Sequence, residues 1–153
     1  MTRPLAVTMG EPAGIGPDLL LMLHAQRLER RLPPFLVFGH VEFLKARAKR
    51  LGLDIAIETA EAGTAAALFE RALPVVAIEG EVEDRPGVPD EGAAPVVIGA
   101  ISRAVEATMS GQCRAVVTAP IHKGVLYGAG FSHPGHTEFL ASLCAHDGHA
   151  PLP

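Results

Sequence analysis

Residues 10–18 form the first of three short segments whose residue types could support chemistry, since they place glycines and carboxylates between a predicted strand and a predicted helix. Glycine allows tight turns and close approach of a ligand to the backbone, and N–H groups at a helix start favour anions. The segment lacks both the Gly-Lys-Ser/Thr of a P-loop and the third glycine of the dinucleotide-binding fingerprint. A structural turn and a ligand-binding loop both stay open, and the carboxylates would repel an anion unless they point away or bind a hydroxyl group. The candidate residues are Gly10, Glu11, Gly14, Gly16 and Asp18.

A histidine and a lysine follow the last predicted strand, in the segment 118–123 with the sequence Thr-Ala-Pro-Ile-His-Lys. Lys123 could pair with a phosphate as a point charge, and His122 could donate or accept a hydrogen bond. Ligands of parallel α/β sheets bind beyond the C-terminal ends of strands, where this segment is expected to lie. A lysine on a loop is also common as solvated surface, so both interpretations stay open.

The third segment, residues 133–138, is a polar cluster that follows Pro-Gly at the start of an apolar helix. Thr137 could cap that helix through its hydroxyl group, which leaves the neighbouring His136 unexplained. His136 titrates near neutral pH and could act as a hydrogen-bond partner, an acid/base group or a ligand. Five of the seven histidines follow residue 121, but their spacing matches no metal motif, so His146 and His149 are expected to be incidental.

Short apolar runs alternate with stretches of helical periodicity along the chain, which predicts βαβ units and an α/β fold. Such units form a largely parallel sheet with helices on both faces. The acidic segment 79–92 is expected to be a solvated surface connection. Strands are predicted over residues 4–9, 35–39, 54–58, 74–78 and 114–118, and helices over residues 17–31, 41–51, 61–71, 95–109, 123–128 and 136–146.

The composition excludes several classes of protein. Hydrophobic residues make up 48% of the chain and charged residues 20%, a balance that argues against disorder. The net charge of -4 argues against a generally basic nucleic-acid binder. Apolar runs are too short to span a bilayer, the N-terminus does not resemble a signal peptide, and Cys113 and Cys144 lack metal-knuckle spacing. A cytoplasmic protein with reduced thiols and without membrane or nucleic-acid partners is therefore predicted.

Taken together, residues 8–18, 118–123 and 130–140 resemble three motifs of the 4-hydroxythreonine-4-phosphate dehydrogenase family of pyridoxal phosphate (vitamin B6) biosynthesis. The first reads Thr-Met-Gly-Glu-Pro-Ala-Gly-Ile-Gly-Pro-Asp, and the third contains Gly-His-Thr-Glu. The resemblance implies a homodimeric enzyme with a fold of the isocitrate/isopropylmalate dehydrogenase type. It also implies oxidation of 4-phosphooxy-threonine with NAD or NADP and a divalent metal such as zinc, magnesium or cobalt.

The same resemblance implies roles for single residues. His136 would be the catalytic residue and, with Thr137, would contact the substrate, while Lys123 and His122 would line the same cleft. The residues of the first segment would shape the cleft wall. The family's metal ligands follow the third motif, and no metal ligand is assigned in this chain.

Family members are roughly twice as long as this chain, so the resemblance implies their N-terminal half. Residues 1–118 are then expected to form an α/β domain, and residues 119–153 the truncated start of a second domain. Exposed sheet edges of such a chain predict self-association. Two alternatives remain: a paralogue that oxidises another phosphorylated hydroxy acid, and a non-catalytic module that binds phosphate ligands or associates with itself.

Overall fold

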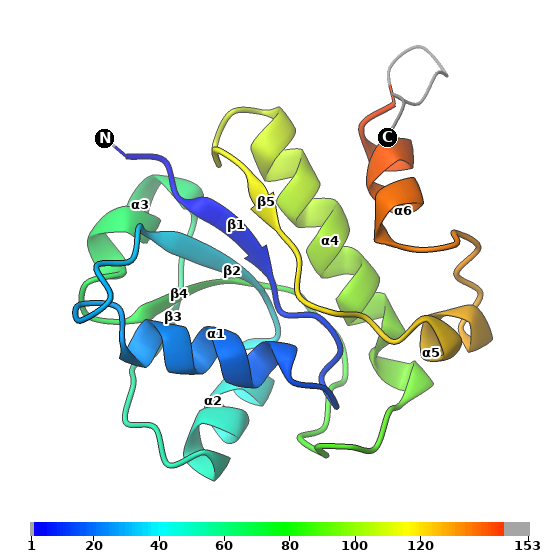
Figure 1. The fold of residues 1–153 in the computed structure, drawn as a ribbon, viewed down its shortest axis with the longest axis horizontal. Helices are drawn as coiled ribbons and strands as arrows, with labels where there is room; N and C mark the ends of the chain where they lie inside the picture. Colours follow the sequence, from blue (N-terminus) through cyan, green and yellow to red (C-terminus); the bar gives the residue numbers. More distant parts are fainter. Residues whose placement is uncertain (1, 146–153) are drawn as a thin grey trace.

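Five parallel strands form one sheet in the computed structural model, which describes residues 2–145 (Figure 1). The strands lie in the order β3-β4-β2-β1-β5. They are β1 (Leu5–Thr8), β2 (Phe35–Gly39), β3 (Ile57–Thr59), β4 (Leu73–Ala77) and β5 (Val116–Val117). The helices are α1 (Gly16–Ala25), α2 (Val41–Arg50), α3 (Ala62–Leu68), the 3-10 turn η1 (Glu91–Ala93), α4 (Ala94–Met109), α5 (Lys123–Gly128) and α6 (His136–Leu143). The predicted α/β class with a parallel sheet is confirmed.

Helices cover both faces of the sheet, as predicted (Figure 1). The chain steps toward one edge from β1 through β2 to β3, and then back through β4 to β5. Because crossovers between parallel strands are right-handed, the two directions place their helices on opposite faces. Accordingly, α1 and α2 lie on one face and α3 and α4 on the other (Figure 1).

Helix α4 is buried on two sides. Its small residues Ala100, Ala104 and Ala107 belong to the main core with the sheet, where short side chains allow the helix to approach closely. Its residues Val97 and Ile101 belong to a second cluster, together with Leu126, Phe131 and Phe139 from α5, α6 and the loop between them. The segment after β5 is therefore held against the outer side of α4.

The predicted elements differ from the observed ones mainly at their ends. The predicted helix 17–31 ends at Ala25, and the chain turns instead, with Arg31 in the left-handed region at φ 50°. The predicted helix 136–146 ends at Leu143, and His146 and His149 lie outside the described residues. None of the helices within residues 2–145 has both the length and the apolar character that crossing a membrane requires.

His24 on α1 is buried, and its pKa predicts a pH-dependent stability. The ring packs edge-on against Phe69 with centroids 5.0 Å apart, and Nε2 lies 3.1 Å from the Phe69 carbonyl oxygen. Burial, followed by the nearby charge of Arg27, lowers the pKa of His24 from 6.5 to about 4. Between these two values the unfolded ring binds a proton and the folded ring does not. The free energy of unfolding should therefore fall by about 3 kcal/mol as the pH drops from 6.5 to 4.

Urea unfolding of the wild-type protein and of His24→Phe at pH 7, 5 and 4 measures this loss. The variant cannot titrate at this position, so its free energy of unfolding should fall less steeply over the same range. Parallel pH profiles for the two proteins would contradict the assignment.

Candidate functional site

The first two segments meet at the C-terminal edge of the sheet, because β1 and β5 are neighbours. The Ala119 N–H donates to Thr8 Oγ1 over 3.2 Å, and the Glu11 N–H donates to the Pro120 carbonyl oxygen over 2.9 Å. Residues that are 111 positions apart in the chain are therefore in direct contact. The segment after β5 therefore packs against the turn that follows β1.

Two glycines of the turn are required by this contact. A Cβ atom on Gly10 would lie 2.5 Å from the Pro120 carbonyl oxygen, and Gly10 also has φ +73°. A Cβ atom on Gly16 would lie 2.8 Å from Ala119 Cβ and 2.8 Å from the Met9 carbonyl oxygen. These glycines make room for protein, so the structural-turn interpretation explains both of them.

Gly16→Ala should lower the free energy of unfolding by about 1–3 kcal/mol, because the added methyl group overpacks the contact with Ala119. Gly63→Ala is a matched control, since Gly63 lies in α3 and no described atom falls within 4 Å of its added Cβ. Alanine is favoured over glycine within a helix by up to about 1 kcal/mol, and Gly63 is the second residue of α3, so the control should not lose stability. Urea denaturation of both variants provides the comparison, and equal effects would contradict it.

A buried arginine of α2 also holds the turn. The Arg47 side chain is 1% exposed, and its guanidinium donates to Asp18 Oδ1 over 2.6 Å and to Asp84 Oδ1 over 2.7 Å. It also donates to the carbonyl oxygens of Pro12 and Gly14. Asp18 is therefore engaged with Arg47 of α2, although its side chain remains 32% exposed.

Glu11 is turned inward, since it is buried and its Oε1 accepts a hydrogen bond from the Ala13 N–H over 3.1 Å. The two carboxylates of the first segment are thus engaged within the protein.

The acidic segment 79–92 is only partly the solvated connection that was predicted. Asp84 is 11% exposed, because Arg47 and Arg50 both bind its carboxylate, each over 2.7 Å. Burial opposes the charged form of Asp84, but the hydrogen bonds from Arg50 and Arg47 hold its pKa below the usual value. The Gly87 N–H also donates to the Ala13 carbonyl oxygen over 2.8 Å. The segment is part of the structure that supports the turn.

Sequence reasoning missed Arg47, although its position carried a signal. It follows Phe43 and Leu44 by four and three residues, so it lies on the apolar face of α2, next to Ala48. A charged residue on the buried face of a helix needs a buried partner. Its partners stand 29 and 37 positions away in the sequence, so no local pattern identifies them.

The third segment lies beside Lys123. A Cβ atom on Gly135 would be 3.3 Å from Lys123 Cε and 3.4 Å from Lys123 Nζ, so the lysine side chain runs along this glycine. His136 follows directly and is the first residue of α6. Its Nε2 atom is buried and has no hydrogen-bond partner among the described residues. Burial, and then the charge of Lys123, lowers the pKa of His136.

The loop before α6 is held in place by aromatic packing. The His133 ring lies 5.3 Å from that of Phe131 and 5.0 Å from that of Phe139, centroid to centroid. The Tyr127 hydroxyl donates to the Pro134 carbonyl oxygen over 2.9 Å. These contacts fix the backbone that carries Gly135 and His136.

Two of the predicted site residues have positions that the sequence did not reveal. His122 is exposed and caps α5, with its Nδ1 accepting a hydrogen bond from the Val125 N–H over 3.2 Å. Thr137 is exposed and is the second residue of α6, so its predicted role as the cap of this helix is wrong. The N-cap of α6 is the extended Gly135, and no described side chain caps the helix with a hydrogen bond.

Comparison with known proteins identifies the family. A family model described as "Pyridoxal phosphate biosynthetic protein PdxA" matches residues 31–151, which is most of the chain. The chain belongs to the PdxA family. It is 47% identical, over 99% of its length, to the 4-hydroxythreonine-4-phosphate dehydrogenase of Bradyrhizobium diazoefficiens, of which it covers 46%. It is also 47% identical, over 97% of its length, to the enzyme of the same name from Methylorubrum populi, of which it covers 43%.

Solved structures agree with this assignment. The 4-hydroxythreonine-4-phosphate dehydrogenase from Burkholderia phymatum superposes on 94% of this chain with a TM-score of 0.83 and 28% identity. The alignment covers 44% of that protein. The corresponding enzyme from Klebsiella pneumoniae superposes with a TM-score of 0.78 over 93% of the chain and 44% of its own. This PdxA-family chain therefore spans under half the length of the relatives it matches.

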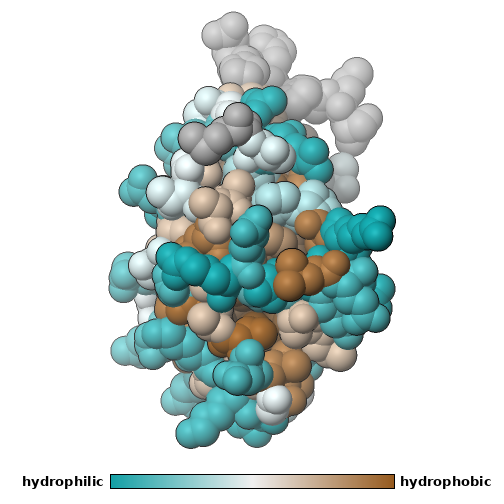
Figure 2. All heavy atoms as spheres, turned by 90° about the vertical axis from the view of Figure 1, so that its left-hand side faces the viewer, coloured by the Kyte–Doolittle hydropathy of each residue, from teal (hydrophilic) through white to brown (hydrophobic). Residues whose placement is uncertain are grey.

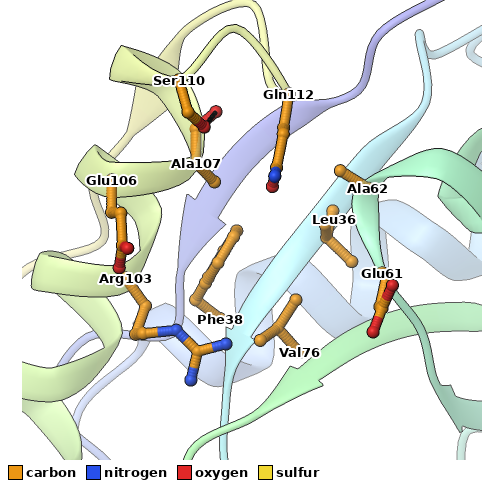
Figure 3. Close-up of a pocket in the computed structure, with 10 residues that line it drawn as sticks. All are labelled: Leu36, Phe38, Glu61, Ala62, Val76, Arg103, Glu106, Ala107, Ser110 and Gln112. Atoms are coloured by element: carbon orange, nitrogen blue, oxygen red, sulfur yellow. Dashed lines mark hydrogen bonds between the residues drawn. The ribbon is translucent and has the colours of Figure 1, made fainter.

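The family match includes the second and third segments of this PdxA-family chain, and the first lies before it. Within residues 2–145, no three His, Cys, Asp or Glu side chains gather closely enough to hold a metal ion. A cavity of about 370 Å³ opens between α3 and α4, with Leu36, Phe38 and Val76 as its floor (Figure 3). It lies on the α3–α4 face of the sheet and is lined by none of the residues of the three segments.

Proposed function

We propose that this chain supplies substrate-binding residues of a 4-hydroxythreonine-4-phosphate dehydrogenase. The observation that supports the proposal most strongly is the placement of Lys123 along Gly135, next to His136 in the chain. Its charge contributes to the lowered pKa of His136, whose Nε2 atom is buried and has no hydrogen-bond partner among the described residues. Buried polar atoms normally have hydrogen-bond partners, so an exception calls for a ligand or another functional reason. A phosphorylated hydroxy-amino acid carries groups that would satisfy both side chains.

Each residue of the proposed site has a distinct role. Lys123 offsets the negative charge of the phosphate or carboxylate group. His136, kept neutral at pH 7 by its lowered pKa, forms a hydrogen bond to the substrate and can hold or move a proton at Nε2. The exposed Thr137 hydroxyl binds the polar head or phosphate, and His122 lines the same cleft. The turn over residues 10–18 shapes the cleft wall by seating the segment after β5.

The cofactors of the proposed reaction are NAD or NADP and a divalent metal. A nicotinamide would supply the hydride acceptor, and a divalent metal would polarise the substrate hydroxyl group. The described residues fit neither group, since they contain no three-ligand cluster and protein atoms fill the space next to Gly10 and Gly16. We therefore assign no step of the oxidation through either cofactor to these residues.

Calorimetry with 4-phosphooxy-threonine tests the binding role of the chain. We expect saturable binding to the 153-residue chain, and a loss of about tenfold or more in affinity for Lys123→Gln, because one charge-assisted contact disappears. Arg114→Gln is a control, since Arg114 is exposed at the start of β5, at the opposite end of that strand from Lys123. Absence of binding to the wild-type chain would contradict the proposal. Tighter binding of another phosphorylated hydroxy acid would identify a paralogue.

A non-catalytic binding module is the second candidate, because the described residues contain no three-ligand cluster. An assay of NAD(P) reduction with added zinc or magnesium tests whether this chain is a dehydrogenase or a non-catalytic module. Turnover by this chain alone would exclude the module. Binding of a phosphorylated ligand without turnover would favour the module.

We also propose that the chain associates with a second copy of itself through an apolar flank formed by Leu19, Leu23 and Val117. Val117 pairs with Val7, and Val7 with Val37, so all three valines share the face opposite to the cavity-lining Phe38. Gly16 of α1 faces Ala119, and Leu19 and Leu23 follow it by three and seven residues, on the same side of the helix.

The flank is open, with exposed fractions of 49% for Leu19, 40% for Leu23 and 46% for Val117. Figure 2 shows a different side of the molecule, the one on the left in Figure 1, where apolar groups are interrupted by hydrophilic ones. Exposed apolar side chains gathered on one flank favour association with another protein surface. Dimers or larger assemblies are therefore expected in solution.

Light scattering should detect self-association of the wild-type chain and a shift toward monomer in the double variant Leu19→Asp/Leu23→Asp. Leu28→Asp is the matched control, since Leu28 is exposed but lies beyond the end of α1. The charges oppose burial of the flank, whereas the control leaves it intact. A wild-type chain that stays monomeric at high concentration would contradict the proposal.

A further inference from the structure

The buried guanidinium of Arg47 has no role in substrate binding as proposed, yet it joins three parts of the chain. It extends from α2 to Asp18 on α1, to Asp84 in the acidic segment, and to the carbonyl oxygens of Pro12 and Gly14 in the turn. A guanidinium group is planar and presents its donors in fixed directions. The two turn carbonyls must therefore point toward the same group, which leaves the turn a single orientation.

The orientation of the turn is transmitted to the second segment. Gly10 and Gly16 stand at the two ends of the turn, and both are in close contact with Ala119. Gly10 is also in close contact with Pro120. The Glu11 N–H donates to the Pro120 carbonyl oxygen on the same surface. Three residues after Pro120 the chain reaches Lys123, whose side chain runs along Gly135.

We propose that Arg47 is a positioning residue for the site. It holds the turn in the shape on which Ala119 and Pro120 rest, and it thereby places Lys123 beside His136. The importance of Arg47 for substrate binding rests on the proposed function, whereas its hydrogen bonds to the turn do not depend on that proposal.

The acidic segment acts as the second anchor of this arrangement. Asp84 binds Arg47 from the side opposite to Asp18, and the Gly87 N–H donates to the Ala13 carbonyl oxygen, between the two carbonyls that Arg47 holds. Arg50 contacts Asp84 from the exterior, through the carboxylate and the main-chain carbonyl. None of the hydrogen bonds of Arg50 among the described residues reaches the turn.

Amide hydrogen exchange on the full chain separates local positioning from a general contribution to stability. The reporters are the Glu11 and Gly14 amides, which donate to the carbonyl oxygens of Pro120 and Glu11 over 2.9 and 3.0 Å. The reference is the amide of Val37, a fully buried residue of the central strand β2. Loss of global stability accelerates all of these amides together, whereas a loosened turn accelerates only the reporters.

Three variants make the comparison. Arg47→Lys keeps the charge but loses the forked contacts, so the reporters should exchange about tenfold or more faster relative to Val37. Asp84→Asn keeps the shape of the side chain but removes its charge, and should give a smaller change in the same direction. Arg50→Lys, which alters only the outer contact of Asp84, should leave the ratio within about twofold of the wild type.

Reporters that keep their wild-type rates, or that accelerate only in step with Val37, would overturn the proposal. If Arg47→Lys does not fold, the same ratio in Asp84→Asn decides. Binding of 4-phosphooxy-threonine is measured on the same samples. Failure of the wild-type chain to bind it would reject the proposed function and leave the exchange result valid for Arg47.

Discussion

Replacing the histidine that aligns with His136 by alanine in a full-length 4-hydroxythreonine-4-phosphate dehydrogenase is expected to lower kcat/KM by about 10²-fold or more. The ring begins α6, and its Nε2 atom is buried without a partner among the described residues. Burial and the charge of Lys123 lower its pKa, so the ring is neutral at pH 7 and can hold a proton for the substrate or accept one from it. Steady-state kinetics measures the loss.

The replacement of the same histidine by glutamine identifies what the ring contributes. Glutamine can form a hydrogen bond but cannot titrate, so it should restore activity only where orientation of the substrate is the main role. If the ring transfers a proton, the loss persists. The wild-type acid limb of kcat/KM should then lie below pH 6.5, because the pKa of His136 is lowered from 6.5. An unchanged kcat/KM in the alanine variant would exclude His136 from the site.

Arg47→Met is expected to lower the free energy of unfolding of this chain by about 3–5 kcal/mol, since removing one member of a buried charge network leaves its partners without compensation. The Asp18 carboxylate and the carbonyl oxygens of Pro12 and Gly14 would lose the donor that Arg47 provides, whereas Asp84 would keep its contact with Arg50. Urea unfolding at pH 7 measures the difference.

Arg71→Met is the matched control, because Arg71 is 69% exposed and pairs only with Glu58 among the described residues. An exposed ion pair contributes about 0–1 kcal/mol, so this variant should remain close to the wild type. Equal losses in the two variants would contradict the special role of Arg47.

The free energy of unfolding at acidic pH provides a second comparison between the wild type and Arg47→Met. The pKa of Asp84 is lowered from 3.8, so the stability that its charge contributes is present above pH 3.8 and is lost as the pH falls through the lower folded value. Arg47→Met should flatten that loss. The loss from His24 falls in a separate range, between pH 6.5 and about 4.

Local patterns predicted the elements of this protein well. Helix α5 occupies the predicted residues 123–128, and β2 the predicted residues 35–39, because apolar periodicity and turn residues are properties of a few neighbouring positions. The ends of the elements were predicted less accurately, as with the helix predicted to reach residue 31, which ends at Ala25. Packing decides such ends, and the chain there turns back toward β2.

The sequence by itself determined the α/β class, the three segments and their resemblance to the PdxA family, since each depends on residue types at short spacing. Only the tertiary structure decided what those residues contact. The strand order places β1 beside β5 and brings the acidic segment under the first turn, so that Glu11 and Asp18 are engaged within the protein and Gly10 and Gly16 accommodate Ala119. Such contacts join residues that are tens of positions apart, and they arise from the crossover connections of the sheet, which no local pattern records.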